Sequence, residues 1–460
     1  MALKDAFKSD ELIRNAKLIH MIGIGGSGMN PIAEILHNKG YKITGSDNNE
    51  TDSLKRVRSL GIPITMGHFP ENVHGSDLVI YSAAIMKDNP ELVEAERLGI
   101  PTLERSYALG ALTRRFDNVI GICGTHGKTT VTAMTTQILI GAGKDPSAVI
   151  GGKLPLTGSY GISGRSETMV VESCEYVDTF LKLSPDTAVI LNIDRDHMEY
   201  FKTLDRLKQS FHTFASRARK VIVNGDDENT LDAVSGIDVI KYGLSENCDY
   251  RAENVKYGTK TAGSFDFCRN GERLCTVEVS VPGKHNISNA CAAAAVAYEN
   301  GVSPEDIVKN IKEFRGAGRR FEVLGEYDGI TVADDYAHHP KELEVTLNAA
   351  MNMGYDRVIA VFQPFTYSRT VMLFDDFVRV LKIPDHVVLS EIMGSREKNT
   401  YGIHAKQLSD KIEGSVQFDT FDEITDYLEK TAKSGDLVIT LGCGDIYKVA
   451  KKFCERLKNR

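Results

Sequence analysis

A glycine-rich segment in residues 118–134 restricts the possible fold more than any other stretch of this chain. The apolar run 119–123 is followed by Gly-Thr-His-Gly-Lys-Thr-Thr at 124–130 and then by a second apolar stretch. This order predicts a buried strand, a tight loop and a helix that begins at about Lys128. In such a loop, backbone N–H groups and the positive end of the helix dipole meet at one anion. The segment therefore predicts a nucleoside triphosphate site in an α/β domain.

The residue types of this loop suit bound phosphates. Lys128 would place an ammonium beside the β- and γ-phosphates, and the Thr129 hydroxyl would ligate Mg²⁺. The ATP-binding residues predicted in the loop are Gly124, Thr125, His126, Gly127, Lys128, Thr129 and Thr130. The spacing departs from the usual phosphate loop, because Ile122 stands where a glycine is expected. An ordinary strand-to-helix turn with a surface lysine is the alternative interpretation.

A second glycine motif lies near the start of the chain. Gly23, Gly25 and Gly28 follow an apolar strand and satisfy G-x-G-x-x-G, and a helix over 30–38 and a strand over 41–44 are predicted after them. Asp47 stands about 20 positions further on, where a dinucleotide fold binds a ribose. This pattern predicts a Rossmann-like unit for a ligand with a diphosphate and a ribose. NAD and a sugar nucleotide both have these groups.

The middle of the chain is predicted to be a parallel sheet. The apolar runs 168–172, 187–193 and 220–223 do not alternate with polar residues, which is typical of strands buried on both faces. Glu172 and His197 follow two of these strands, so both are expected at the rim where open α/β sheets bind ligands. Residues 245–281 are predicted to be an antiparallel insertion, and Asn289 carries a carboxamide suited to an adenine edge.

From residue 321 onward, strands alternate with helices as in a small doubly wound domain. The predicted strands are 331–333, 357–362, 387–389 and 437–441, and the predicted helices are 341–351, 371–381, 421–432 and 445–457. A basic, glycine-broken linker that includes Arg320 precedes this part. The predicted domains are 1–113, 114–320 and 321–460.

Composition excludes several classes of protein. The chain has 460 residues, 42% of them hydrophobic and 26% charged, and its net charge of −8 argues against a nucleic acid partner held by phosphate contacts. It has no predicted signal peptide and no run of about 18 apolar residues that would insert into a membrane. The eight cysteines are scattered and are expected to be reduced thiols of a cytoplasmic protein. Either a monomer or a homodimer fits these observations.

Six motifs taken together carry a resemblance to the Mur ligases. They begin at Gly23, Gly124, Asn192, His285, Asp335 and Gln363, and they occur in the family's order across the whole chain. The resemblance implies three α/β domains: an N-terminal Rossmann-like domain, a central P-loop-type ATPase domain with a parallel sheet, and a C-terminal Rossmann-like doubly wound domain. It implies a carboxylate–amine ligase that uses ATP and Mg²⁺ and forms an acyl phosphate. The N-terminal glycine loop and the Tyr-Ala-His-His-Pro loop point to the branch of the family that adds L-alanine to UDP-N-acetylmuramate in peptidoglycan synthesis. A murein tripeptide ligase of cell-wall recycling is the alternative within the family.

The resemblance also implies roles for individual residues. The implied catalytic residues are Lys128, Glu172, His197, His338 and Arg369. The implied metal ligands are Thr129, Glu172 and His197, and Asn289 and Arg320 complete the ATP site. The implied UDP-sugar residues are Gly25, Gly26, Ser27, Gly28, Met29, Ser46, Asp47, Ser82 and Ala84. Tyr336, His338 and Arg369 would bind the amino acid, with Arg369 on its carboxylate.

Three features differ from the family pattern. Many relatives have Glu-Ala-Asp-Glu-Ser-Asp where this chain has Glu172-Ser-Cys-Glu-Tyr-Val-Asp, although the first glutamate is retained. Phe365 replaces the histidine that usually follows Gln-Pro, which removes one expected polar contact from the amino acid pocket. Lys208 lies near the place of a carbamylated lysine of some relatives, and we do not assign it that role. Outside the family, an NAD-dependent oxidoreductase and a P-loop ATPase or switch are the alternatives.

Overall fold

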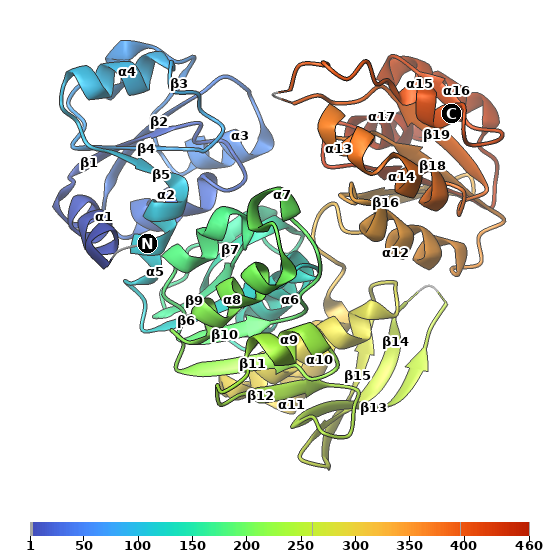
Figure 1. Cartoon of the computed structure of the whole chain (residues 1–460), viewed down its shortest axis with the longest axis horizontal. Helices are drawn as coiled ribbons and strands as arrows, with labels where there is room; N and C mark the ends of the chain where they lie inside the picture. The colour runs from blue at the N-terminus through green and yellow to red at the C-terminus, as the bar shows by residue number, and fades with distance from the viewer. Residues whose placement is uncertain (1–2, 260, 396, 460) are drawn as a thin grey trace. The chain divides into compact units, whose positions relative to one another are not determined.

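The computed structural model describes residues 3–259, 261–395 and 397–459, which contain three β-sheets (Figure 1). These residues form two compact units. Unit 1 comprises the residues up to Val255 together with Phe265–Glu278 and Ile287–Phe314. Unit 2 comprises Lys256–Ser264, Val279–Asn286 and the residues from Arg315 onward. The domain boundaries predicted at 113 and 320 stay predictions.

The first sheet is parallel and belongs to unit 1. Its strand order is β3-β2-β1-β4-β5. The strands are β1 (Leu18–Ile22), β2 (Lys42–Asp47), β3 (Ile64–Met66), β4 (Leu78–Tyr81) and β5 (Thr102–Glu104). The helices are α1 (Leu3–Asn15), α2 (Asn30–Asn38), α3 (Asp52–Ser59), η1 (Pro70–Val73), α4 (Pro90–Arg97) and α5 (Arg105–Thr113). The order reverses at β1, and ligands bind beside such a switch point, at the carboxyl ends of the strands. The predicted helix over 30–38 is confirmed.

The second sheet has ten strands in the order β15-β14-β13-β12-β11-β10-β6-β9-β7-β8. The strands are β6 (Asn118–Cys123), β7 (Ser147–Leu154), β8 (Ser159–Ile162), β9 (Thr168–Glu172), β10 (Thr187–Ile190), β11 (Lys220–Asn224), β12 (Ile240–Gly243), β13 (Tyr250–Tyr257), β14 (Gly263–Arg269) and β15 (Glu272–Val279). The central strands are parallel, as predicted. A two-residue link joins the neighbours β14 and β15, which requires antiparallel pairing in the insertion.

Helices and a 3₁₀ helix accompany this sheet. They are α6 (Lys128–Gly141), η2 (Tyr176–Lys182), α7 (Met198–Phe201), α8 (Leu204–Ala215), α9 (Glu228–Ala233), α10 (His285–Glu299) and α11 (Pro304–Glu313). β6 ends one residue before the glycine loop, and α6 begins at Lys128, as predicted. The strand–loop–helix cradle therefore lies at the centre of the sheet, between β10 and β9.

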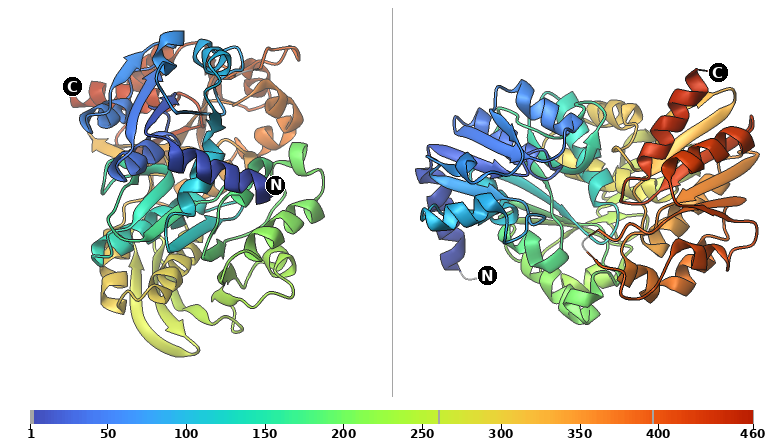
Figure 2. Two further views of the ribbon diagram at one scale, coloured as in Figure 1. Left: turned by 90° about the vertical axis from the view of Figure 1, so that its left-hand side faces the viewer. Right: turned by 90° about the horizontal axis from the view of Figure 1, so that it is seen from above.

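The third sheet, in unit 2, has the order β16-β17-β21-β18-β19-β20. The strands are β16 (Glu322–Tyr327), β17 (Ile330–Asp335), β18 (Arg357–Phe362), β19 (His386–Ser390), β20 (Val416–Phe418) and β21 (Asp436–Leu441). The helices are α12 (Pro340–Met351), α13 (Tyr367–Met372), α14 (Phe374–Val380), α15 (Ala405–Ser409), α16 (Phe421–Thr431) and α17 (Tyr447–Lys458). One buried cluster contains side chains of α12, α14 and α15, and another contains those of α16 and α17. The ribbon of this part of the chain is orange to red in Figure 2. The doubly wound prediction is confirmed.

The helix predicted over 371–381 is wrong in its start and its continuity. The structure has α13 and α14, which meet at Leu373. The first turn of α13 is held by Glu397, which accepts a 2.9 Å hydrogen bond from the Ser368 backbone and another from its hydroxyl. Because Glu397 comes from a distant loop, no local pattern predicts this helix start. None of the described helices combines the length and apolar character needed to cross a membrane.

Candidate active site

The glycine loop between β6 and α6 forms a cradle. Asn192, which follows the neighbouring strand β10, is hydrogen-bonded to this loop. The Thr125 N–H donates to the Asn192 carbonyl at 2.9 Å, and the His126 N–H donates to the Asn192 side chain at 2.8 Å. Gly127 has a φ of +84°, which favours glycine. A Cβ added to Gly127 would lie 2.7 Å from Asn289 Oδ1, so the Asn289 side chain lies against the loop. The first N–H groups of α6 have no partner within the helix and are suited to phosphate oxygens.

Lys128 is held inside this cradle by a carboxylate that the sequence analysis did not single out. Its ammonium donates to the Thr125 carbonyl at 3.0 Å and lies 3.0 Å from Glu175 Oε2. The Glu175 side chain is 1% exposed and that of Lys128 is 15% exposed, so the pair is largely desolvated. Burial opposes the charge of Lys128, but its neighbours, with Glu175 the strongest of them, together outweigh burial, and the pKa of the ammonium lies above its ordinary value. Glu175 therefore neutralises Lys128 in this structure.

Thr129 and Glu172 lie together at the start of α6. The Thr129 hydroxyl donates to Glu172 Oε1 at 2.9 Å, and the Gly151 N–H of β7 donates to Glu172 Oε2 at 2.6 Å. A Cβ at Gly151 would lie 2.5 Å from Glu172 Oε1, so only glycine fits there without displacing the carboxylate. This hydroxyl–carboxylate pair offers the oxygen ligands that Mg²⁺ prefers. Gly151 was not predicted, since its role depends on the pairing of β7 with β9.

His197 stands at the start of α7 with a φ of +54°. Among the described residues, Glu175, Asp196 and His197 offer ligand atoms that all lie within 4.8 Å of one another. The backbone N–H of His197 donates to Asp196 Oδ1 at 2.8 Å. Glu175 thus lies between Lys128 and His197, and it connects the cradle to the histidine predicted to bind metal. Lys208, by contrast, pairs with Asp232 at 2.9 Å.

The N-terminal glycine loop forms a second ligand rim in unit 1. The Gly25 N–H donates to Asp47 Oδ2 at 2.9 Å, so the predicted acidic residue closes the loop. Gly26 and Ser27 are exposed, Gly28 and Ser82 are partly exposed, Ala84 is exposed, and Met29 is buried. A Cβ at Gly28 would lie 3.0 Å from Arg105 Nη1. Arg105, which sequence reasoning missed, thus brings a cation to the loop predicted to hold a diphosphate.

Ser46 is turned into the domain rather than toward this rim. It is fully buried, and its hydroxyl donates to Glu91 Oε2 at 2.7 Å. Glu91 also accepts a 2.9 Å hydrogen bond from His68 Nδ1 and another from Asn72 Nδ2. Burial alone would raise the pKa of Glu91, but His20, Asn72 and Ser46 outweigh it and hold the pKa below its ordinary value. The buried cluster fixes the end of β2 at Ser46, one residue before the Asp47 that closes the glycine loop.

The residues predicted to bind the amino acid lie in unit 2, where Arg369 is close enough to His338 to affect its pKa. Arg369 Nη1 is buried and has no hydrogen-bond partner among the described residues. The His338 ring lies 5.7 Å from the Tyr336 ring and 6.4 Å from the Phe365 ring, and burial lowers the pKa of His338. His338 Nδ1 lies 3.1 Å from the Tyr336 carbonyl, and the Arg320 guanidinium lies 5.4 Å above the Tyr336 ring. An unpartnered guanidinium N–H beside a neutral imidazole suits a ligand carboxylate.

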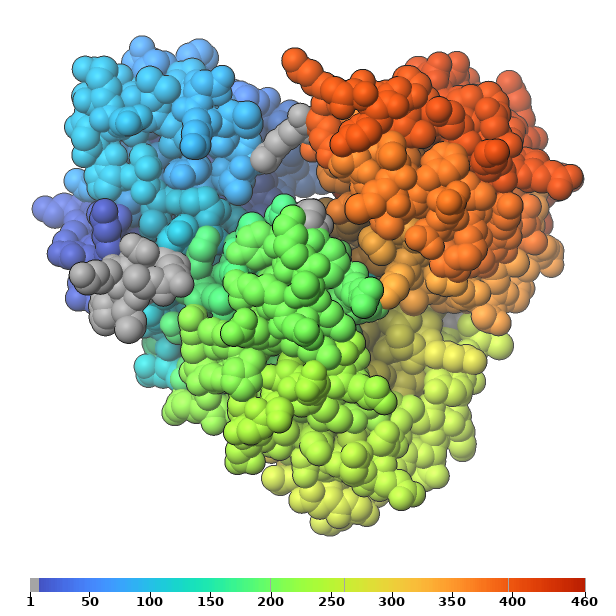
Figure 3. Space-filling model, in the orientation of Figure 1, coloured from blue at the N-terminus to red at the C-terminus, as the bar shows by residue number. Residues whose placement is uncertain are grey.

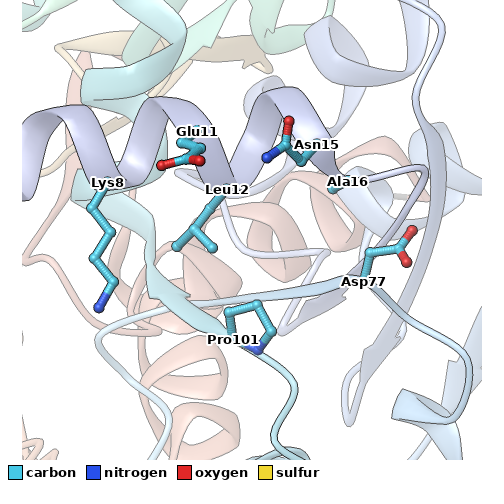
Figure 4. A pocket seen from close by; sticks show the side chains of 7 residues that line it. All are labelled: Lys8, Glu11, Leu12, Asn15, Ala16, Asp77 and Pro101. Carbon is cyan, nitrogen blue, oxygen red and sulfur yellow. The ribbon is translucent and has the colours of Figure 1, made fainter.

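A hollow of roughly 350 Å³ opens elsewhere on unit 1 (Figure 4). It is lined by Lys8, Glu11, Leu12, Asn15, Ala16, Asp77 and Pro101. Asp77 and Pro101 precede β4 and β5, so the hollow lies at the amino ends of the strands, opposite the glycine loop. It contains none of the predicted site residues.

Three family profiles match the chain in succession. "Mur ligase family, catalytic domain" matches residues 18–117, "Mur ligase middle domain" matches 122–297, and "Mur ligase, glutamate ligase domain" matches 319–444. The chain is 43% identical over 451 residues to a UDP-N-acetylmuramate–L-alanine ligase of Caldanaerobacter subterraneus subsp. tengcongensis, covering 96% of this chain and 98% of the relative. It is 41% identical to the ligase of the same name from Acetivibrio thermocellus, covering 95% of each.

Solved structures show the same architecture. A UDP-N-acetylmuramate–alanine ligase of Thermotoga maritima superposes with a TM-score of 0.83 at 28% identity, over 97% of this chain and 100% of the other. A murein peptide ligase of Psychrobacter arcticus superposes with a TM-score of 0.73 at 24% identity and shows the fold alone. The three family profiles together cover most of the chain, and the sequence matches extend over nearly its full length. The chain therefore belongs to the Mur ligase family.

Proposed function

We propose that this protein joins L-alanine to the carboxylate of UDP-N-acetylmuramate with cleavage of ATP, as a step in peptidoglycan precursor synthesis. The observation that carries the proposal is the 43% identity, over almost the whole chain, to a ligase of that name. In this reaction, the substrate carboxylate takes the γ-phosphoryl group of ATP, the alanine amine attacks the acyl phosphate, and phosphate leaves.

The cradle residues would manage the negative charge of this reaction. Lys128 would move from Glu175 to the phosphoryl oxygens, and the α6 N–H groups would hold the β-phosphate. Thr129 and Glu172 would hold one Mg²⁺, and His197 would help to hold a second. When bound, Mg²⁺ neutralises charge between the phosphate oxygens. Asn289, which lies against the loop, would contact the nucleotide. Arg320, in unit 2, stays a predicted ATP-binding residue.

The Arg369 group would bind the amino acid. Arg369 would pair with the alanine carboxylate through its unpartnered Nη1. A hydrogen bond from His338 Nδ1 to the Tyr336 carbonyl requires a proton on Nδ1, so Nε2 is left to accept from the alanine amine. Phe365 contributes an apolar ring beside this group, which favours a methyl side chain over a charged one.

The UDP part would lie on the N-terminal rim. The exposed Gly26 and Ser27 would approach the diphosphate, and Arg105 would neutralise it. We also propose a cytoplasmic location, in keeping with eight cysteines that are all free thiols. The oligomeric state, a monomer or a homodimer, stays a prediction.

A phosphate-release assay tests the proposal. The protein is incubated with ATP, Mg²⁺, UDP-N-acetylmuramate and L-alanine, and each substrate is omitted in turn. Phosphate should appear only when both acceptor and amine are present, whereas an ATPase would release it without them. A higher kcat/KM with the murein tripeptide than with L-alanine would favour the recycling ligase instead. Turnover of NAD without ATP would indicate an oxidoreductase.

A further inference from the structure

Two short segments beside the cradle contain residues other than glycine with a positive φ, a backbone conformation that residues with a Cβ rarely adopt. Val177 and Asp178, in η2, have φ values of +49° and +56°. His197 and Lys202, which flank α7, have φ values of +54° and +67°. A left-handed residue other than glycine costs about 1–2 kcal/mol, and a β-branched one such as Val177 is rarer still. Something in the surrounding structure must therefore hold these two segments in place.

Asp178 supplies the contacts that join the two segments. Its Oδ2 accepts a 2.7 Å hydrogen bond from the Tyr200 hydroxyl of α7 and a 3.0 Å hydrogen bond from Arg206 Nη2 of α8. Its Oδ1 accepts a hydrogen bond from the hydroxyl of Ser210, which is fully buried. The side chain is only 16% exposed, so these donors satisfy most of its hydrogen-bonding capacity. The Tyr200 hydrogen bond to this carboxylate also raises the tyrosine's pKa.

These contacts lead directly to His197. The Tyr200 N–H donates to the His197 carbonyl at 2.9 Å, and the Phe201 N–H donates to it at 3.1 Å. From the other segment, the Tyr176 ring lies 4.5 Å from the His197 ring. Asp178 therefore holds α7, whose Tyr200 and Phe201 N–H groups bind the His197 carbonyl. Tyr176, in the same turn as Asp178, contacts the imidazole. The segment of α7 and α8 lies on the face of unit 1 seen in Figure 3, in green.

We propose that Asp178 is a positioning residue, which holds His197 in the orientation that a divalent cation requires by joining the 176–178 turn to α7. The inference rests on the proposed function, because that function makes His197 a metal ligand. It goes beyond it by assigning a role to a carboxylate that would not itself touch the metal or a substrate. Partners that orient metal ligands typically contribute about 10–100-fold to metal affinity.

The test measures Mn²⁺ binding to the nucleotide-free protein. The electron paramagnetic resonance signal of free Mn²⁺ reports how much of the ion is unbound. Asp178→Asn keeps the shape but loses the carboxylate, and Tyr200→Phe removes one donated hydrogen bond. Both should weaken Mn²⁺ binding, Asp178→Asn by about 10-fold or more. Tyr401→Phe, at a tyrosine that is 56% exposed, is the matched control and should bind like the wild type. Asp178→Gly separates strain from contact, since glycine accepts the φ of +56° but has no carboxylate, and it should bind Mn²⁺ as weakly as Asp178→Asn.

A His197→Ala background shows whether the effect passes through the histidine. If it does, adding Asp178→Asn to His197→Ala should change Mn²⁺ affinity by less than about 2-fold, as coupled residues require. Normal Mn²⁺ affinity in Asp178→Asn, with only a lower Tm, would overturn the proposal and leave Asp178 a structural role. An undiminished effect in the His197→Ala background would overturn it as well. Product formation by the wild-type protein, measured in parallel, reports separately on the proposed function.

Discussion

Glu175→Gln tests how the cradle holds its lysine before nucleotide binds. Two unit charges 3.0 Å apart interact by about 5.5 kcal/mol at an effective dielectric constant of about 20, and desolvation offsets part of this. Removing one charge from a buried pair costs about 3–5 kcal/mol. Glutamine keeps an acceptor oxygen, and Lys128 keeps the carbonyls of Gly124 and Thr125. We therefore expect the free energy of unfolding to fall by about 3 kcal/mol, at the lower end of that range.

Although Glu175→Gln should be less stable than the wild type, it should bind nucleotide more tightly. In the variant, Lys128 has no counter-ion, and the phosphates of a bound nucleotide supply one. The affinity for a non-hydrolysable ATP analogue without Mg²⁺ should therefore rise by about 10-fold, or 1.4 kcal/mol. Urea unfolding and isothermal titration calorimetry measure the two effects, and Glu167→Gln, at an exposed glutamate, is the control. A fall in analogue affinity would refute the reasoning, because it would mean that Glu175 contributes to the bound state.

Three further predictions concern other parts of the protein. Arg369→Lys should raise the KM for L-alanine by about 10-fold or more and leave the KM for ATP unchanged in steady-state assays, because lysine cannot bind a carboxylate bidentately; an unchanged KM for L-alanine would exclude the carboxylate contact. Gly151→Ala should raise the Mg²⁺ concentration for half-maximal activity by about 10-fold, since its Cβ would lie 2.5 Å from Glu172 Oε1; an unchanged Mg²⁺ titration would contradict the metal role of Glu172. Burial raises the pKa of Asp335 from 3.8 to about 6, so the folded protein retains a proton that the unfolded chain loses between these values. Stability should therefore fall by up to about 3 kcal/mol as pH rises from 4 to 6. In Asp335→Asn, urea unfolding should no longer show this fall in the free energy of unfolding between pH 4 and 6; an unchanged fall would mean that another group causes it.

The sequence predicted those elements that are determined by residues close together in the chain. The phosphate cradle follows from glycines and an apolar strand that are contiguous, and α2 follows from a proline near its start and an apolar face. Glu175, Gly151 and Arg105 were missed, because each acquires its role only when strands or loops distant in sequence come together. The start of α13 was missed for the same reason, since Glu397 holds its first turn from another loop.

The sequence also grouped Ser46 with the residues that would touch a ligand, and here the structure shows a different use of its side chain. The motif analysis placed Asp47 correctly at the glycine loop, where its carboxylate accepts from the Gly25 N–H. The strand predicted over 41–44 ends too early, because β2 runs to Asp47. The motifs do not show that the hydroxyl of the adjacent Ser46 points inward to Glu91. Sequence spacing thus predicts which strand end lies at a rim, whereas the direction of each side chain depends on partners across the domain.

The cluster around Glu91 has an evolutionary consequence. Glu91 is fully buried and accepts hydrogen bonds from Ser46, His68 and Asn72, so replacing any one donor by an apolar residue leaves a desolvated carboxylate short of a partner. Replacing Glu91 alone would in turn leave three donors without their acceptor. Single substitutions are therefore disfavoured in each direction, and lineages that alter this cluster should change its members as a set. A serine whose hydroxyl is bound to Glu91 would then persist beside the predicted ligand rim for as long as the buried glutamate does.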